Sequence, residues 1–72
     1  MNWIDIKNFN RPNESSEDAY LVICHNKEET EFGYHFGELI RGDLYVESWV
    51  MNHYGPGYFI SHFCKLSPPN DK

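Results

Sequence analysis

The expected fold rests on one stretch, which reads Ala19-Tyr20-Leu21-Val22-Ile23-Cys24-His25-Asn26. It holds the longest apolar run of the chain, from Ala19 to Cys24, and is rich in β-branched residues. A continuous apolar run between polar turns indicates a strand that is covered on both faces. We therefore predict a central β-strand here.

The next segment, residues 30–39, follows a predicted hairpin turn at residues 26–29 and alternates with period two. This alternation predicts a second strand, with Phe32, Tyr34 and Phe36 on one face. Gly33 and Gly37 lie on the other face. Glycines in a strand either allow a close approach by another group or mark a bulge.

Two further strands are expected beyond a turn at Arg41-Gly42-Asp43. Residues 44–51 alternate, with Val46 and Val50 on one face and Trp49 on the other. Residues 52–57 form a loop, because Gly-Pro-Gly cannot continue a strand ladder. In a regular last strand over residues 58–66, Phe59 and Phe63 lie opposite His62 and Cys64.

The ends of the chain complete the expected architecture. Residues 1–10 are an N-terminal arm or edge strand, residues 11–18 a polar loop and residues 67–72 a flexible tail. The fold class is mainly β: a small antiparallel meander of four to five strands with little helix. Residues 1–72 form a single domain, because no second core fits in this length.

Composition narrows the function classes. Six Lys and Arg against eleven Asp and Glu give a net charge of −5, which makes nucleic-acid binding unlikely, since that binding depends on cations that meet phosphates. No apolar run approaches the about 20 residues of a membrane span, and no signal peptide is evident. We expect a cytoplasmic protein in which Cys24 and Cys64 are free thiols, although a disulfide between neighbouring strands is geometrically possible.

Several short motifs occur in a familiar order along the chain. They are Trp3-Ile4, Pro12, Leu21-Val22-Ile23, Gly33-Tyr34-His35 and Ile60-Ser61-His62-Phe63-Cys64-Lys65-Leu66-Ser67-Pro68-Pro69. In this order the chain resembles the small phage and prophage proteins grouped as domain of unknown function 551. Phe63 stands where that family has Trp, Cys64 where it has Met, and Arg11 where it has Leu. The resemblance implies a phage or prophage origin, hence the cytoplasm of a bacterial host cell, and a small β-rich fold. It implies no activity, cofactor or catalytic residue.

The residues themselves show no catalytic or metal-binding constellation. His62 is either a ligand-contacting or metal-binding imidazole, or a half-buried structural histidine bonded to a backbone carbonyl, and we favour the second interpretation. Cysteines and histidines are present, but their spacing does not match a zinc site. Cys64 and His62 share a face without forming a nucleophile–base pair. We predict that the protein is not an enzyme and needs no metal or cofactor.

The aromatic residues, 17% of the chain, suggest how it acts. Their simplest interpretation is a core under one sheet face. A sheet without a covering helix, however, leaves its other apolar face exposed, and such a patch marks an interface. We therefore expect self-association through a sheet face or an edge strand, with a dimer as the first expectation.

Two functions follow from this pattern. The first is a small non-enzymatic accessory protein of phage or prophage type that binds a host protein through an aromatic sheet face or an acidic surface. The alternative is a homo-oligomeric binder that sequesters a small nucleotide signal. In that case Tyr34, Tyr54 and Trp49 stack the base, while Arg41, Lys65 and the amides of Gly55–Gly57 meet phosphate.

Overall fold

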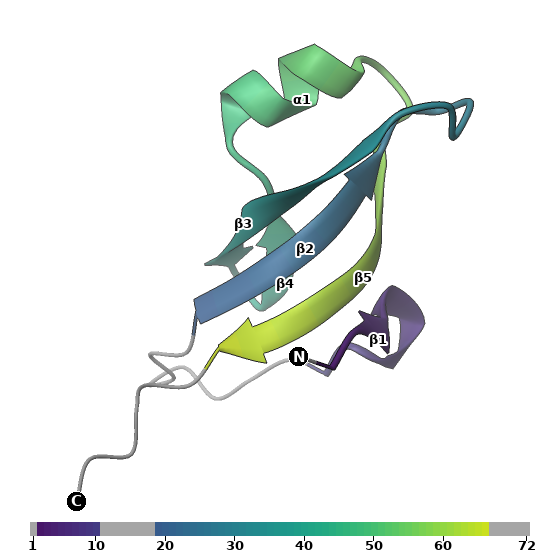
Figure 1. Cartoon of the computed structure of the whole chain (residues 1–72). Helices are drawn as coiled ribbons and strands as arrows, with labels where there is room; N and C mark the ends of the chain where they lie inside the picture. The colour runs from purple at the N-terminus through teal and green to yellow at the C-terminus, as the bar shows by residue number, and fades with distance from the viewer. Residues whose placement is uncertain (1, 11–18, 67–72) are drawn as a thin grey trace, which may run out of the picture.

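A computed structural model describes residues 2–10 and 19–66 of the chain. Five antiparallel strands form one sheet in the order β1-β5-β2-β3-β4 (Figure 1). Their bounds are β1 Ile4–Asp5, β2 Ala19–His25, β3 Phe32–Ile40, β4 Asp43–Tyr45 and β5 Phe59–Leu66. A 3-10 helix, η1 (Ile6–Asn8), follows β1, and an α-helix, α1 (Ser48–Tyr54), lies between β4 and β5. The predicted mainly β, antiparallel fold is confirmed.

The stretch at residues 19–26 takes the central place expected of it, but the expected cover on both faces is wrong. Tyr20, Val22 and Cys24 are buried under the helix side, whereas Leu21, Ile23 and His25 on the other face are only half-buried. β2 pairs with β3 on one side and with β5 on the other, so it is an inner strand of the sheet. The N-terminal segment contributes an edge strand, because Ile4 and Asp5 of β1 pair with Phe63 and His62 of β5. The predicted polar loop at residues 11–18 and the tail at residues 67–72 lie outside the described residues.

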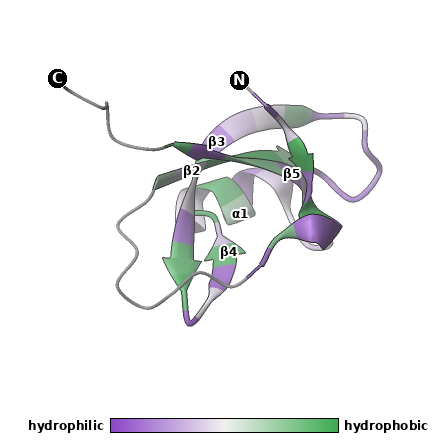
Figure 2. Cartoon of the chain, turned by 90° about the horizontal axis from the view of Figure 1, so that it is seen from below, coloured by the Kyte–Doolittle hydropathy of each residue, from purple (hydrophilic) through white to green (hydrophobic). Residues whose placement is uncertain are grey.

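The strand order departs from a simple meander. β2, β3 and β4 are neighbours in sequence order, but β5 then pairs with β2 rather than with β4. Helix α1 makes this possible, because it carries the chain from the β4 edge back across the sheet. Figure 2, viewed from below, shows α1 inside the outline of the curled strands.

The prediction of a strand over residues 44–51 is wrong beyond Tyr45. Val46, Val50 and Tyr54 are buried, while Ser48 is exposed. Their spacing of four residues fits one face of a helix. All three positions would also share one face of a strand, since their spacings are multiples of two. The exposed Ser48, which a strand would place on that same face, separates the two patterns. The helix ends at Gly55, whose φ of +82° suits a glycine and whose N–H bonds the carbonyl of Met51.

The core lies between α1 and the surface of the sheet that we call the core face. Its strand residues are Tyr20, Val22, Cys24 and Phe63, all buried. Gly33 and Gly37 of β3 point to the same face and allow close packing. A Cβ at Gly33 would lie 2.5 Å from Tyr54 Oη, and one at Gly37 would lie 2.9 Å from Val22 Cγ1. The predicted close approach at these glycines is therefore confirmed.

A β-bulge in β5 overturns the predicted faces of the last strand. Cys24 pairs with Ile60 and Ile23 pairs with His62, so Ser61 is an extra residue between them. An inserted residue reverses the alternation of the side chains on either side of it. Phe59 therefore points away from the core whereas Phe63 enters it, and Ile60 no longer shares a face with His62. Phe59 and Phe63 were expected on one face, and the structure corrects this.

Of the described residues, none belongs to a helix long and apolar enough to cross a membrane. Cys24 and Cys64 are both buried free thiols, as expected. They lie on opposite faces of the sheet, because Cys24 joins the core and Cys64 pairs with Leu21 on the other side. Burial raises the pKa of the Cys24 thiol, which keeps that thiol protonated and unreactive.

Candidate functional site

The surface of the sheet opposite α1 is the strongest candidate for a functional site. Strand register arranges its side chains in three rows that cross β3, β2 and β5. The rows are Phe32–His25–Phe59, Tyr34–Ile23–His62 and Phe36–Leu21–Cys64. We call these three rows the aromatic face.

Four rings of the aromatic face are open to solvent. The exposed fractions are 57% for Phe32, 62% for Tyr34, 69% for Phe36 and 36% for Phe59. Exposed apolar residues that occur singly need no explanation, but a contiguous group on one rigid surface marks an interaction site. The interpretation of Phe32, Tyr34 and Phe36 as core residues is therefore wrong. They form the exposed apolar patch that was the alternative interpretation.

Two histidines and a serine form a hydrogen-bonded chain on this face. His25 Nε2 lies 2.7 Å from Ser61 Oγ, and that oxygen lies 2.8 Å from His62 Nδ1. A hydroxyl has one hydrogen, so with both imidazoles neutral Ser61 donates to one ring and accepts from the other. His62 is half-buried as expected, but its ring hydrogen-bonds the Ser61 hydroxyl and not the backbone carbonyl that was predicted.

Aromatic stacking fixes the position of His25. Its ring is nearly parallel to that of Phe59, with centroids 4.9 Å apart and planes 8° apart. Phe32 packs on it from the other side at 5.7 Å. Trp3, beside the edge strand β1, reaches Tyr34 with centroids 5.7 Å apart. The face is thus an ordered array of rings on paired strands.

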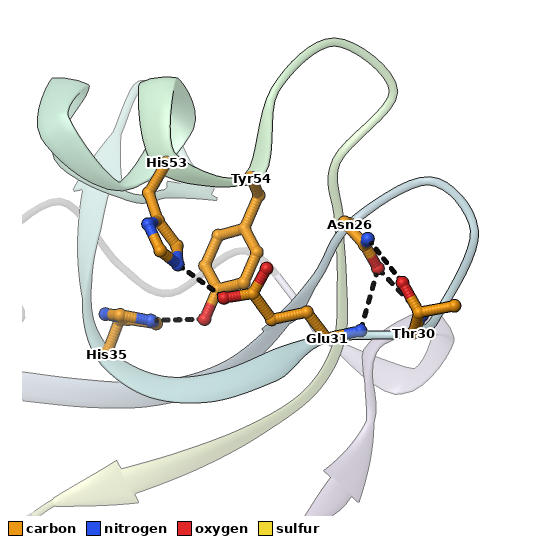
Figure 3. Close-up of polar contacts among 6 residues, drawn as sticks. All are labelled: Asn26, Thr30, Glu31, His35, His53 and Tyr54. Carbon is orange, nitrogen blue, oxygen red and sulfur yellow. Dashed lines mark hydrogen bonds and ion pairs between the residues drawn. The ribbon is translucent and has the colours of Figure 1, made fainter.

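A separate polar cluster attaches α1 to the opposite, core side of β3 (Figure 3). Tyr54 Oη lies 2.9 Å from His35 Nε2, and His53 Nε2 lies 2.7 Å from Glu31 Oε2. The side-chain oxygen of Asn26 accepts hydrogen bonds from the backbone N–H groups of Thr30 and Glu31 and so shapes the turn that carries Glu31. These contacts hold the helix on the sheet.

Burial shapes the titration of this cluster. Burial lowers the pKa of His35, and the neighbouring His53 lowers it further. Burial raises the pKa of Tyr54, with smaller contributions from Cys24 and Glu31. Both shifts favour the neutral forms, which suits a hydrogen bond between imidazole and phenol in the packed layer.

The lowered pKa of His35 predicts a pH effect on stability. The unfolded chain takes up a proton near the ordinary histidine pKa of 6.5, before the folded chain does. The free energy of unfolding should therefore fall from about pH 6.5 downward, and level off once the pH passes the folded-state pKa. Urea unfolding at pH 7.5 and 5.5 measures the decline, and His35→Gln should reduce it. Equal declines in the two proteins would contradict the assignment.

The five residues predicted for binding do not form one site. Tyr34 and His62 lie in the same row of the aromatic face. Tyr54 and Trp49 both contact His35 on the core side, where Tyr54 is buried and Trp49 exposed. Arg41 lies in the turn between β3 and β4 with a φ of +55°.

Seven of the nine residues of the aromatic face were not singled out from the sequence as binding residues: Phe32, Phe36, Phe59, His25, Leu21, Ile23 and Cys64. The period-two pattern of β3 already grouped the first two with Tyr34. Phe59 lies on this face because of the bulge at Ser61 in β5, for which the sequence carries no glycine signal.

Other site types find little support within the described ranges. No group of three or more His, Cys, Asp or Glu side chains there is placed to hold a metal ion. A shallow pocket of about 430 Å³ opens between η1, β4 and β5, and none of the predicted binding residues is among its described lining residues. Comparison with protein-family models, curated proteins and solved structures finds no match to this chain.

Proposed function

We propose that this chain is a small non-enzymatic binding protein and that its aromatic face docks on a partner protein. The observation that carries this proposal is the exposure of Phe32, Tyr34 and Phe36 side by side on β3. The same strand turns its two glycines and His35 toward the helix. The sheet thus divides its residues between a packed face and an open one.

Energetic considerations support a binding role for these rings. A ring of this kind buries about 150–250 Å², and aromatic residues are enriched among those that dominate binding energy at interfaces. Because the rings are on paired strands and Phe32 packs edge-on against Tyr34, with centroids 6.0 Å apart, little side-chain freedom is lost when a partner covers them. A flat, preorganised aromatic surface therefore suits a protein partner.

The charges around the face indicate the chemistry of that partner. Glu38 continues β3 beyond Phe36, and Asp5 pairs with His62 at the β1 edge. Glu28, Glu29 and Glu31 lie in the turn at the other end of β3. With a net charge of −5, this acidic surround favours a partner with an apolar patch and a rim of Lys and Arg.

Site-specific photocrosslinking tests the proposal. A benzophenone amino acid replaces Tyr34 in cells of the organism that encodes the chain, and a matched protein carries it at Trp49. These side chains are similarly exposed, at 62% and 59%, on different surfaces. We expect a discrete adduct with one protein other than the chain itself, whose contact surface has a rim of Lys and Arg, from position 34 only. This adduct should be lost when Phe32→Thr and Phe36→Thr are added. The same adducts from both positions, or none from position 34, would refute a partner on this face.

The phage or prophage origin and the host identity of the partner are predictions from the resemblance. The alternative function, nucleotide binding, gains no specific observation. Its base-stacking residues are divided between the two faces, because Tyr34 is on the aromatic face and Tyr54 is on the core side.

A further inference from the structure

The outer edge of β3 is open over most of its length. β4 pairs with Glu38, Leu39 and Ile40 of β3, and among the described residues no strand pairs with the same edge from Phe32 to Gly37. Those six residues include no charged residue and no proline. Such residues are the usual protection of an edge strand against pairing with another chain.

The backbone of this edge has a defined direction. The N–H of Asn26 bonds the carbonyl of Glu31 at 3.1 Å, which starts the ladder between β2 and β3. Because antiparallel ladders alternate, Gly33, His35 and Gly37 direct their N–H and C=O groups toward β2. Phe32, Tyr34 and Phe36 then direct theirs outward. The residues that display the exposed rings also display the unpaired backbone groups.

We propose that a second copy of this chain pairs with this edge, antiparallel, about a two-fold axis at Tyr34. In that register Tyr34 lies opposite Tyr34 of the copy, and Phe32 lies opposite Phe36. All three outward residues then exchange hydrogen bonds with a partner residue, six bonds in all by the alternation of the ladder. The sheet becomes continuous through both copies, and their aromatic faces merge into one surface.

The edge is self-complementary in a way that a random partner strand is not. Its outward residues are spaced symmetrically about Tyr34, as an interface between identical subunits requires. Each aromatic ring meets a ring across the join, and such cross-strand pairs stabilise a sheet. If the register shifts by two residues, the two-fold axis lies at Gly33 or His35. One of the three outward residues then has no outward aromatic residue of the copy opposite it.

Neighbouring elements leave room for the copy. Beyond Gly37 the edge is occupied by β4, whose first pair is Glu38 with Tyr45. In the proposed register Glu38 would face position 30 of the copy. Thr30 belongs to the turn that leads back to β2, on the far side of β3. The β4 of each copy therefore lies beside the end of the other copy's open edge and not beside its middle.

The exposed area indicates why backbone pairing is needed. From their exposed fractions, the three rings together offer roughly 280–470 Å² of accessible surface per copy. A stable interface buries about 800 Å² per partner, which is more than this. Ring contact alone is therefore insufficient, and the hydrogen bonds of the edge supply the remaining stabilisation. We expect a dimer that dissociates on dilution. This assembly goes beyond the proposed function, because it needs no other protein.

Sedimentation equilibrium of the purified chain, with oxidative crosslinking of cysteine variants, tests the pairing. The wild type should sediment as a monomer–dimer equilibrium. Tyr34→Cys should form a disulfide dimer, because its copy lies directly opposite. Phe32→Cys and Phe36→Cys should each crosslink poorly alone, since identical positions are about 13 Å apart, but should crosslink to each other when mixed. Circular dichroism checks that each variant is folded.

Two results would overturn the pairing: a monomer at every concentration, or homodimers of Phe32→Cys as abundant as the mixed dimer. Neither result tests the docking of a partner protein. Photocrosslinking at Tyr34 tests that docking, because the mass of the adduct identifies a different protein. Loss of that adduct, in turn, leaves the sedimentation result unchanged. The two proposals therefore fail separately.

Discussion

Replacing Tyr54 with alanine should lower the free energy of unfolding by about 3–5 kcal/mol, the usual cost of removing a large buried ring. Tyr54 is the buried end of α1, and its hydroxyl bonds His35. A domain of this size holds only about 3–5 kcal/mol in total. The variant should therefore be largely unfolded in the absence of denaturant, as measured by circular dichroism during urea titration.

A matched variant separates burial from residue type. Tyr34 also lies against β2, but on the open face, and Tyr34→Ala should change stability by less than about 1 kcal/mol. Tyr54→Phe keeps the ring and should cost about 1 kcal/mol through the lost hydrogen bond. If Tyr34→Ala were as damaging as Tyr54→Ala, the assignment of core and open faces would be wrong.

The second large effect is expected at Phe63. Its ring is buried and packs edge-on against Phe9, with centroids 5.1 Å apart, and against Tyr20 at 6.3 Å. Phe63→Ala should cost about 3–5 kcal/mol. Urea unfolding of this variant and the wild type under the same conditions gives the difference.

Phe59→Ala is the control for the bulge at Ser61. In a regular strand Phe59 and Phe63 share a face, so both substitutions would remove core rings and have similar costs. With the bulge, Phe59 lies on the aromatic face and stacks on His25, and its loss should cost no more than about 1.5 kcal/mol. Similar costs at positions 59 and 63 would argue for a regular β5.

The elements with a single pattern were predictable from sequence. The apolar run of β2 has no competing interpretation, and the alternation of β3 extends over enough residues to define both faces. The glycines of β3 were expected either to admit a close neighbour or to mark a bulge, and the structure shows the first: a Cβ there would meet Tyr54 Oη or Val22 Cγ1. In these cases local pattern and tertiary packing agree.

The errors arose where two periods fit the same residues. Val46 and Val50 are compatible with a strand or with a helix, and no strong N-terminal cap marks the start of α1: Glu47 makes no side-chain capping bond. The predicted meander order was wrong because helix α1 was not predicted. Only a crossover connection such as α1 brings β5 next to β2. For such a segment, the choice between strand and helix depends on which of its side chains the rest of the chain buries.

The candidate site was predicted in part for a related reason. Tyr34 and His62 were chosen on their own properties, and register places them in one row with Ile23. Trp49 and Tyr54 were chosen as possible stacking partners, but the helix takes both to the other side of β3. Membership of a face is a property of register and bulges, and these depend on the whole sheet.

The central claim is that Phe32, Tyr34 and Phe36 serve binding and not folding. The most direct test is the free energy of unfolding of the triple variant Phe32→Thr, Tyr34→Thr, Phe36→Thr, in which threonine keeps a high strand propensity. Urea titration at low micromolar concentration should place it within about 1 kcal/mol of the wild type, as expected for surface positions. A loss of several kcal/mol, or a variant that does not fold, would show that these rings belong to the core and would contradict the account.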